Sequence, residues 1–213
     1  MTDLYIFDFD GTLGDSRGLI VRTMMDTFDR MGISRPSVEA CVRTIGLPLS
    51  DCFAVSAGLD KRKSEDCAST YREIFKVNNK KGAVTPFDGV IDTLHHLHDE
   101  GKTLAMASSR QHESLDILVD DFGIASLFAM IVGGDDVTEP KPNAEPVNLI
   151  LSTLDFSPSQ ALVVGDAPVD ILMGRNAGTR TCAVTYGNGS IDELKASQPD
   201  YLIDKFCELS EIE

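Results

Sequence analysis

Two aspartates follow an apolar segment at the start of the chain. The segment Leu4–Phe7 is continuous and rich in β-forming residues, which predicts a strand buried on both faces, and Asp8 and Asp10 come soon after it. Side chains two positions apart on a strand share a face, so these two carboxylates project together from the strand's end. They repel each other unless a hard cation with oxygen ligands, such as Mg²⁺, lies between them. We therefore predict a Mg²⁺ site here; the alternative is an acidic turn in solvent.

Four more polar residues lie at or near the ends of later predicted strands. Ser108, Lys141 and Asp166 each follow a separate strand, and Asp170 stands four residues after Asp166 near the start of a predicted helix. Each of them alone has an ordinary explanation as a turn, surface or helix-capping residue. The carboxyl ends of parallel strands, however, converge on one crevice. We therefore expect these residues to join the N-terminal aspartates, with Lys141 and a divalent cation offsetting the carboxylate charge.

The elements that must position these residues alternate between strand and helix from residue 83 onward. Short β-rich segments are separated by segments of helical periodicity that end near residues 100, 122, 154 and 178. Such alternation is typical of right-handed crossovers in a doubly wound parallel sheet with helices on both faces. We therefore predict an α/β fold whose strands span residues 4–7, 103–107, 129–132, 161–164, 181–184 and 201–203.

The part of the chain before residue 83 has a different pattern. After the first strand, helical periodicity covers residues 16–31, 37–44, 49–57 and 61–77, with breaks at glycine and proline residues. A run of helices inserted between two α/β stretches predicts a separate helical domain. We place this domain at residues 16–82 and the α/β core at residues 1–15 and 83–213.

The composition limits the classes of partner. The formal net charge of −15 would repel nucleic acid and anionic membrane surfaces, and no segment rich in Lys and Arg offsets it. No apolar run approaches the ~20 residues that a membrane-spanning helix needs, and the N-terminus lacks the features of a signal peptide. The five cysteines are scattered without a CxxC pair, so no disulfide framework or zinc site is expected. We therefore expect a cytoplasmic protein that binds neither nucleic acid nor membrane.

The polar residues at the strand ends also match a known set of motifs. They resemble, in order, the four motifs of the haloacid dehalogenase superfamily: residues 8–12, Ser108, Lys141 with Pro142, and Gly165 and Asp166 with Asp170. Two further segments, residues 133–137 and 185–187, are similar to the phosphoglycolate phosphatase group of that superfamily. The resemblance covers nearly the whole chain. It implies a Rossmann-like core and identifies the helical insert as a cap domain.

The resemblance also implies a role for each site residue. Asp8 would be the nucleophile that forms an aspartyl-phosphate, and Asp10 would be the general acid and base, with its backbone carbonyl on the metal. Asp8 and Asp166 would ligate Mg²⁺ directly, and Asp170 directly or through water. The substrate would be held by the remaining residues, namely Ser108, Lys141 and the backbone N–H of Ser109 at the phosphoryl group, and Arg43 in the cap loop at the leaving group.

These roles predict Mg²⁺-dependent hydrolysis of a small phosphorylated metabolite, a phosphate monoester similar to phosphoglycolate. The protein is expected to be a monomer or a homodimer, and the sequence leaves that choice open. An inorganic pyrophosphatase and a sugar-phosphate mutase of the same superfamily stay open, because both resemble this chain in the core motifs. A signalling receiver domain is also phosphorylated on aspartate near Mg²⁺, but its acidic pair is adjacent and it has no helical insert. A binding protein without catalysis is disfavoured, because all the catalytic residue types are present.

Overall fold

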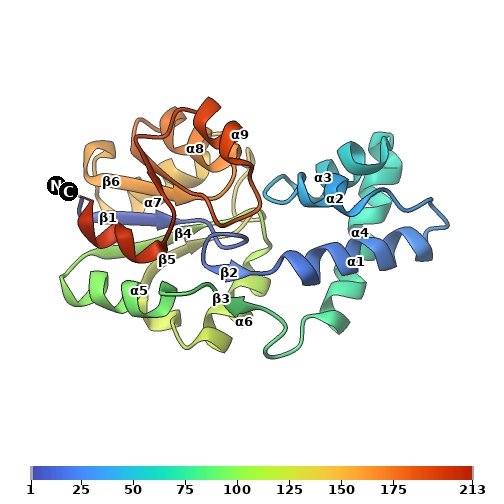
Figure 1. Ribbon diagram of the computed structural model, residues 1–213, viewed down its shortest axis with the longest axis horizontal. Coiled ribbons are helices and arrows are strands. Elements are labelled where there is room, and N and C mark those ends of the chain that lie inside the picture. Colours follow the sequence, from blue (N-terminus) through green and yellow to red (C-terminus); the bar gives the residue numbers. More distant parts are fainter. Residues whose placement is uncertain (1, 213) are drawn as a thin grey trace.

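The computed structural model describes residues 2–212, and within them six parallel strands form one sheet in the order β5-β4-β1-β6-β7-β8. The strands are β1 (Leu4–Phe7), β4 (Thr103–Ala107), β5 (Phe128–Val132), β6 (Ala161–Gly165), β7 (Arg180–Val184) and β8 (Tyr201–Ile203). The chain order of the strands reverses beside β1, which is where open α/β sheets bind ligands. The predicted doubly wound parallel sheet is therefore confirmed (Figure 1).

Helices cover both faces of this sheet because alternate residues of each strand point to opposite sides. In β1, Tyr5 and Phe7 belong to one apolar cluster, and Leu4 and Ile6 belong to another. The first cluster is covered by α5 (Val90–Asp99), α6 (His112–Phe122) and the short helix η3 (Phe206–Glu211), and the second by α7 (Glu145–Leu154) and α8 (Pro168–Asn176). β1 is consequently buried on both faces, as its unbroken apolar sequence predicts.

The register of the central strands brings their polar ends together. Phe7 lies opposite Met106 on β4 and opposite Val164 on β6. Ser108 and Asp166 each lie two residues beyond those partners, so they follow their strands at the same edge of the sheet as the segment after Phe7. Parallel pairing thus joins residues that are about a hundred or more positions apart in the sequence.

A helical segment leaves the sheet between two very short strands, β2 (Gly14–Asp15) and β3 (Thr85–Pro86), which pair antiparallel. It contains α1 (Arg17–Arg30), α2 (Val38–Val42), α3 (Leu49–Ala57) and α4 (Lys61–Asn78). Stacked and edge-on aromatic contacts between Phe28, Phe53, Tyr71 and Phe75 hold α1, α3 and α4 together. Figure 1 shows this segment beside the sheet, at the end toward which β1 points. Its treatment as a domain of residues 16–82 stays a proposal.

The structure adds elements that the sequence patterns do not predict. The β2–β3 pair has two residues in each strand, too few to show a strand period. Helix α9 (Ile191–Ala196) is also short, and it packs Leu194 against Ile171 of α8 and Ala183 of β7. Helix α2 ends earlier than predicted, and residues 43–47 turn instead, with Gly46 at a φ of 103°. Within residues 2–212, no helix is both long and apolar enough to cross a bilayer.

Candidate active site

Lys141 joins two aspartates at the end of the central strand. Its ammonium Nζ donates to Oδ1 of Asp8 at 2.6 Å and to Oδ1 of Asp170 at 2.7 Å, and all three side chains are almost fully buried. Burial opposes the charged form of the lysine, but the two carboxylates outweigh it and raise the pKa of Lys141 above its ordinary value. Lys141 is therefore a fixed positive charge beside Asp8.

Asp8, Asp166 and Asp170 form a cluster that could hold a metal ion. One oxygen from each of these buried residues lies within 4.8 Å of the others. Burial raises the pKa of Asp8 to about 7, with Asp170 and Asp10 adding to the shift and Lys141 opposing it. Burial, Asp170 and Asp8 likewise raise the pKa of Asp166 well above its usual range. A single lysine does not offset three buried carboxylates, whereas a divalent cation with oxygen ligands would.

The loop after β7 holds Asp166 in place. The backbone N–H of Asn188 donates to Oδ2 of Asp166 at 2.5 Å, and the Thr12 hydroxyl donates to its Oδ1 at 3.3 Å. A Cβ on Gly187 would lie 2.2 Å from Cβ of Asp166, so only glycine lets this loop approach so closely. Asn188 has no role in the sequence-based prediction, because it lies in a loop without a recognised chemical motif.

Asp10 is not a member of the three-carboxylate cluster, and its carboxylate pairs with Arg110 instead. Nε and Nη2 of Arg110 donate to the two carboxylate oxygens of Asp10 at 2.6 and 2.7 Å, and the hydroxyl of Ser16 also donates to Asp10. The guanidinium lies over the rings of Phe9 and Phe75, at 5.8 and 4.9 Å from their centroids. Phe75 belongs to α4, so this interaction also links the sheet to the helical segment.

Ser108 and Ser109, which follow β4, have different surroundings. Ser108 is buried, and its Oγ accepts from the backbone N–H of Arg110 at 3.4 Å. The hydroxyl of Ser109 donates to the carbonyl oxygen of Gly46 at 2.7 Å, so its side chain contacts the loop of the helical segment. Its predicted use of a backbone N–H to bind phosphate stays a prediction.

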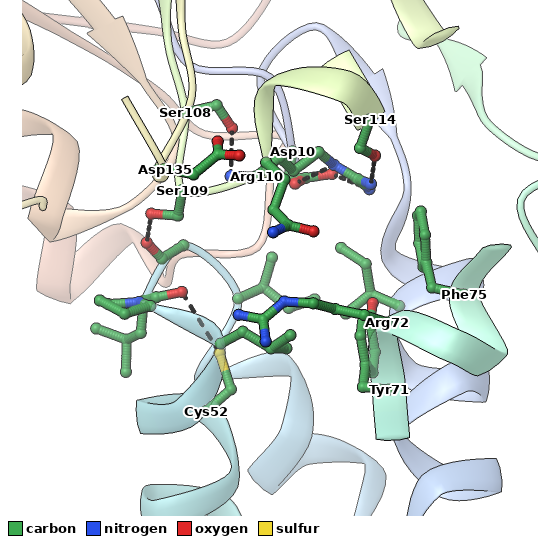
Figure 2. A pocket seen from close by; sticks show the side chains of 18 of the residues that line it. Asp10, Cys52, Tyr71, Arg72, Phe75, Ser108, Ser109, Arg110, Ser114 and Asp135 are labelled. Atoms are coloured by element: carbon green, nitrogen blue, oxygen red, sulfur yellow. Dashed lines mark hydrogen bonds and ion pairs between the residues drawn. The ribbon is translucent and has the colours of Figure 1, made fainter. Parts of the chain in front are cut away.

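A cavity of about 410 Å³ lies between the sheet and the helical segment. Its lining includes Asp8, Asp10, Ser108 and Arg110 on one side and residues 45–50 and α4 on the other. Figure 2 shows Asp10, Arg110 and Ser108 on one wall, with Arg72, Tyr71 and Cys52 facing them. Lys141, Asp166 and Asp170 do not line the cavity but lie against Asp8. The predicted residues 8, 10, 108, 141, 166 and 170 are thus together at one edge of the sheet.

Arg43 is placed differently from the other predicted residues. It is exposed at the end of α2 and does not line the cavity, and its positive charge acts on Glu39 and Glu193 instead. A contact with a ligand in the cavity would need another arrangement of its loop. Its predicted role at the leaving group stays a prediction, and the cavity is lined by two other arginines, Arg72 and Arg110.

Comparison with known proteins agrees with this arrangement. Pyrophosphatase PpaX from Bacillus velezensis is 34% identical over 207 residues, which cover 97% of this chain and 94% of the relative. A haloacid dehalogenase-like hydrolase from Streptococcus pneumoniae superposes with a TM-score of 0.89 at 27% identity, covering 99% of this chain and 97% of the other.

A third comparison concerns the fold alone. The structure of a predicted phosphoglycolate phosphatase from Haemophilus somnus superposes with a TM-score of 0.88 at 24% identity, covering 99% of this chain and 97% of the other.

The sequence model that describes haloacid dehalogenase-like hydrolases matches residues 5–184. The chain therefore belongs to the haloacid dehalogenase-like hydrolase family.

Proposed function

We propose that this hydrolase is a Mg²⁺-dependent phosphatase that acts on a small phosphate monoester through an aspartyl-phosphate at Asp8. One observation carries the proposal: Asp8 lies at the end of the central strand, bonded to Lys141 and within one cluster with Asp166 and Asp170. A nucleophilic carboxylate beside a fixed cation and a metal-ligand set is what phosphoryl transfer requires.

The metal-binding residues would be Asp8, Asp166 and Asp170, with the backbone carbonyl of Asp10. Their hard oxygen donors suit Mg²⁺, which would supply positive charge next to the phosphoryl oxygens and the Asp8 carboxylate. The side chain of Asn188 lies close to the same carbonyl, since its Nδ2 donates to it at 3.4 Å.

In the first step, a carboxylate oxygen of Asp8 attacks phosphorus while the bond to the leaving-group oxygen breaks and Asp10 gives that oxygen a proton. Asp10 then takes a proton from the water that attacks the aspartyl-phosphate, which releases inorganic phosphate and restores Asp8. Lys141 and the Ser108 hydroxyl hold the phosphoryl oxygens as charge develops on them. Proton donation by Asp10 requires its pairing with Arg110 to weaken, because a neutral carboxyl group accepts hydrogen bonds from a guanidinium more weakly than a carboxylate does.

The helical segment, residues 16–82, would act as a cap over the crevice. The support for this role is the cavity between the two parts, since both contribute to its lining. The ligand would be a small phosphorylated metabolite, because a volume of about 410 Å³ falls at the lower end of ordinary small-molecule sites.

Pyrophosphate is a second candidate substrate. The relative from Bacillus velezensis is named a pyrophosphatase and matches this chain along nearly its whole length. The core residues bind the phosphoryl group that pyrophosphate and phosphoglycolate share, so the two substrates differ only at the leaving group.

A side-by-side assay tests the proposed function. The purified chain is freed of metal with a chelator and given Mg²⁺ or Ca²⁺, and phosphate release is measured with phosphoglycolate, pyrophosphate, an aryl phosphate and a sugar phosphate. We expect hydrolysis with Mg²⁺ and inhibition by Ca²⁺, whose larger and more flexible coordination shell can engage both oxygens of Asp8. Full activity in excess chelator would contradict the metal assignment, and isomerised sugar phosphate without phosphate release would indicate a mutase.

A further inference from the structure

Two cations on α4 line the cavity. Arg72 and Lys76 are four residues apart, so they project from the same face of the helix. Within residues 2–212, neither side chain makes a hydrogen bond or an ion pair. Figure 2 shows the guanidinium of Arg72 reaching into the cavity, between Asp10 and Arg110 on one side and Cys52 on the other.

The aspartates that line the cavity, in contrast, already have hydrogen-bond partners within the site. Asp10 is held by Arg110, Asp8 is bonded to Lys141, and Asp135 accepts the backbone N–H of His112 at 2.8 Å. Glu113 is the remaining carboxylate of the cavity lining, so a single carboxylate is left to balance the charges of the two cations on α4. The wall formed by α4 therefore carries excess positive charge facing the catalytic edge of the sheet.

We infer that Arg72, assisted by Lys76, binds a negative charge on the leaving group of the substrate. The inference rests on the proposed phosphatase function, because the phosphoryl group would lie at Asp8 and Ser108 and only the rest of the substrate would reach α4. The substrate class is then a phosphate compound whose leaving group is itself anionic. A carboxylate and a second phosphate share this chemistry, since both accept two parallel N–H bonds from a guanidinium.

Arg72 thus takes the role at the leaving group that is predicted for Arg43 from the sequence. Both are arginines of the helical segment, but only Arg72 lines the cavity. The two residues can be tested in parallel because each can be replaced by methionine, which keeps most of the length of the side chain and removes its charge.

The test compares substrates that differ in charge at the leaving group. Phosphoglycolate and pyrophosphate have a negatively charged leaving group. The amide of phosphoglycolate, which has nearly the same shape, and an aryl phosphate have an uncharged leaving group. The kcat/KM of each is measured for the wild type, Arg72→Met, Arg72→Lys and Arg43→Met. Arg62→Met is the matched control, because Arg62 is an exposed residue of the same helix outside the cavity lining.

We expect Arg72→Met to lower kcat/KM by about 10-fold or more for at least one substrate with a charged leaving group, and by about twofold or less for the two with an uncharged leaving group. Arg72→Lys should recover part of the loss, and Arg62→Met should resemble the wild type. A loss with phosphoglycolate would show that Arg72 binds a carboxylate, and a loss with pyrophosphate would show that it binds a second phosphate. Equal losses on substrates with charged and uncharged leaving groups would overturn the inference and indicate that Arg72 does not act on the leaving group.

Three other results separate the inference from the function on which it rests. The wild type could hydrolyse the aryl phosphate with Mg²⁺ but show no higher kcat/KM for substrates with a charged leaving group. That result would overturn the inference alone. The same holds if Arg43→Met, and not Arg72→Met, shows the charge-selective loss. A wild type that hydrolyses none of the four compounds overturns the proposed function, and the inference with it.

Discussion

Arg110 binds both carboxylate oxygens of Asp10, through Nε at 2.6 Å and Nη2 at 2.7 Å. The pair is largely buried, with 9% of the Arg110 side chain and 12% of the Asp10 side chain exposed. Because Phe75 of α4 stacks on the same guanidinium, the carboxylate proposed as acid and base is connected to the helical segment. A movement of α4 would therefore change the surroundings of Asp10.

The first prediction concerns the acid-base role of Asp10. Asp10→Ala should lower kcat by about 10²–10⁴-fold, which is the usual contribution of a positioned proton donor and acceptor. The measurement is kcat for the best substrate over a range of Mg²⁺ concentrations. Recovery of activity at high Mg²⁺ would show that Asp10 mainly positions the metal.

The second prediction concerns the Asp10–Arg110 pair itself. A double-mutant cycle of Asp10→Asn and Arg110→Met, followed by urea denaturation without metal, should give a coupling energy of about 1–3 kcal/mol. The exposed pair Arg35 and Asp29, whose side chains are each 53% exposed, is the matched control and should couple much less. Equal coupling in the two cycles would mean that burial does not strengthen the Asp10–Arg110 pair.

The third prediction concerns metal binding to the three-carboxylate cluster. Mg²⁺ should raise the melting temperature relative to the chelator-treated protein, because the ion binds the folded state and relieves repulsion among buried carboxylates. Asp166→Asn should remove most of this shift, measured by differential scanning fluorimetry. Asp135→Asn is the control, since this carboxylate lines the cavity but is not in the cluster. A full Mg²⁺ shift in Asp166→Asn would contradict the ligand assignment.

The fourth prediction concerns pH and the start of α6. A hydrogen bond from His112 to Asp136, 2.5 Å between Nδ1 and Oδ2, raises the pKa of this histidine above its ordinary value. The folded state thus favours the protonated ring, so this stabilisation is complete below the unfolded pKa of about 6.5 and is lost as pH rises through the folded pKa. Because the side chains are 40% and 34% exposed, the effect should stay below about 1 kcal/mol.

The corresponding measurement is the free energy of unfolding of the wild type and His112→Gln at several pH values. The difference between the two proteins should be larger at acidic pH than at alkaline pH. Asp136→Asn should remove most of that dependence, and the weaker effects of Asp116 and Asp135 should remain. A difference that is constant with pH would show that the ion pair adds nothing to stability.

The sheet and the principal site residues could be predicted from the sequence because they depend on local patterns. The bounds of β1, β4 and β8 agree with the apolar segments that predict them. Parallel pairing then fixes where the ends of the strands lie, so Asp8, Ser108 and Asp166 converge although they are distant in the sequence.

The other parts of the site depend on contacts that no local pattern encodes. The partner of Arg110 is a hundred residues away, and the sequence shows it only as a cation after a strand. The periodicity of α4 places Arg72 on an exposed face, but only the packing of the helical segment determines that this face borders the cavity. Arg43 is a cation near a glycine-proline turn, and only the course of that turn shows that it lies outside the lining.

The aspartyl-phosphate at Asp8 is the step on which the proposed reaction depends. The most direct measurement is kcat of Asp8→Asn with Mg²⁺ and the best substrate, alongside circular dichroism and thermal unfolding to verify the fold. The amide is a poor nucleophile of nearly the same shape, so we expect kcat to fall by about 10⁴-fold or more while the protein stays folded. A folded Asp8→Asn variant that keeps substantial kcat would contradict the mechanism and place the nucleophile elsewhere.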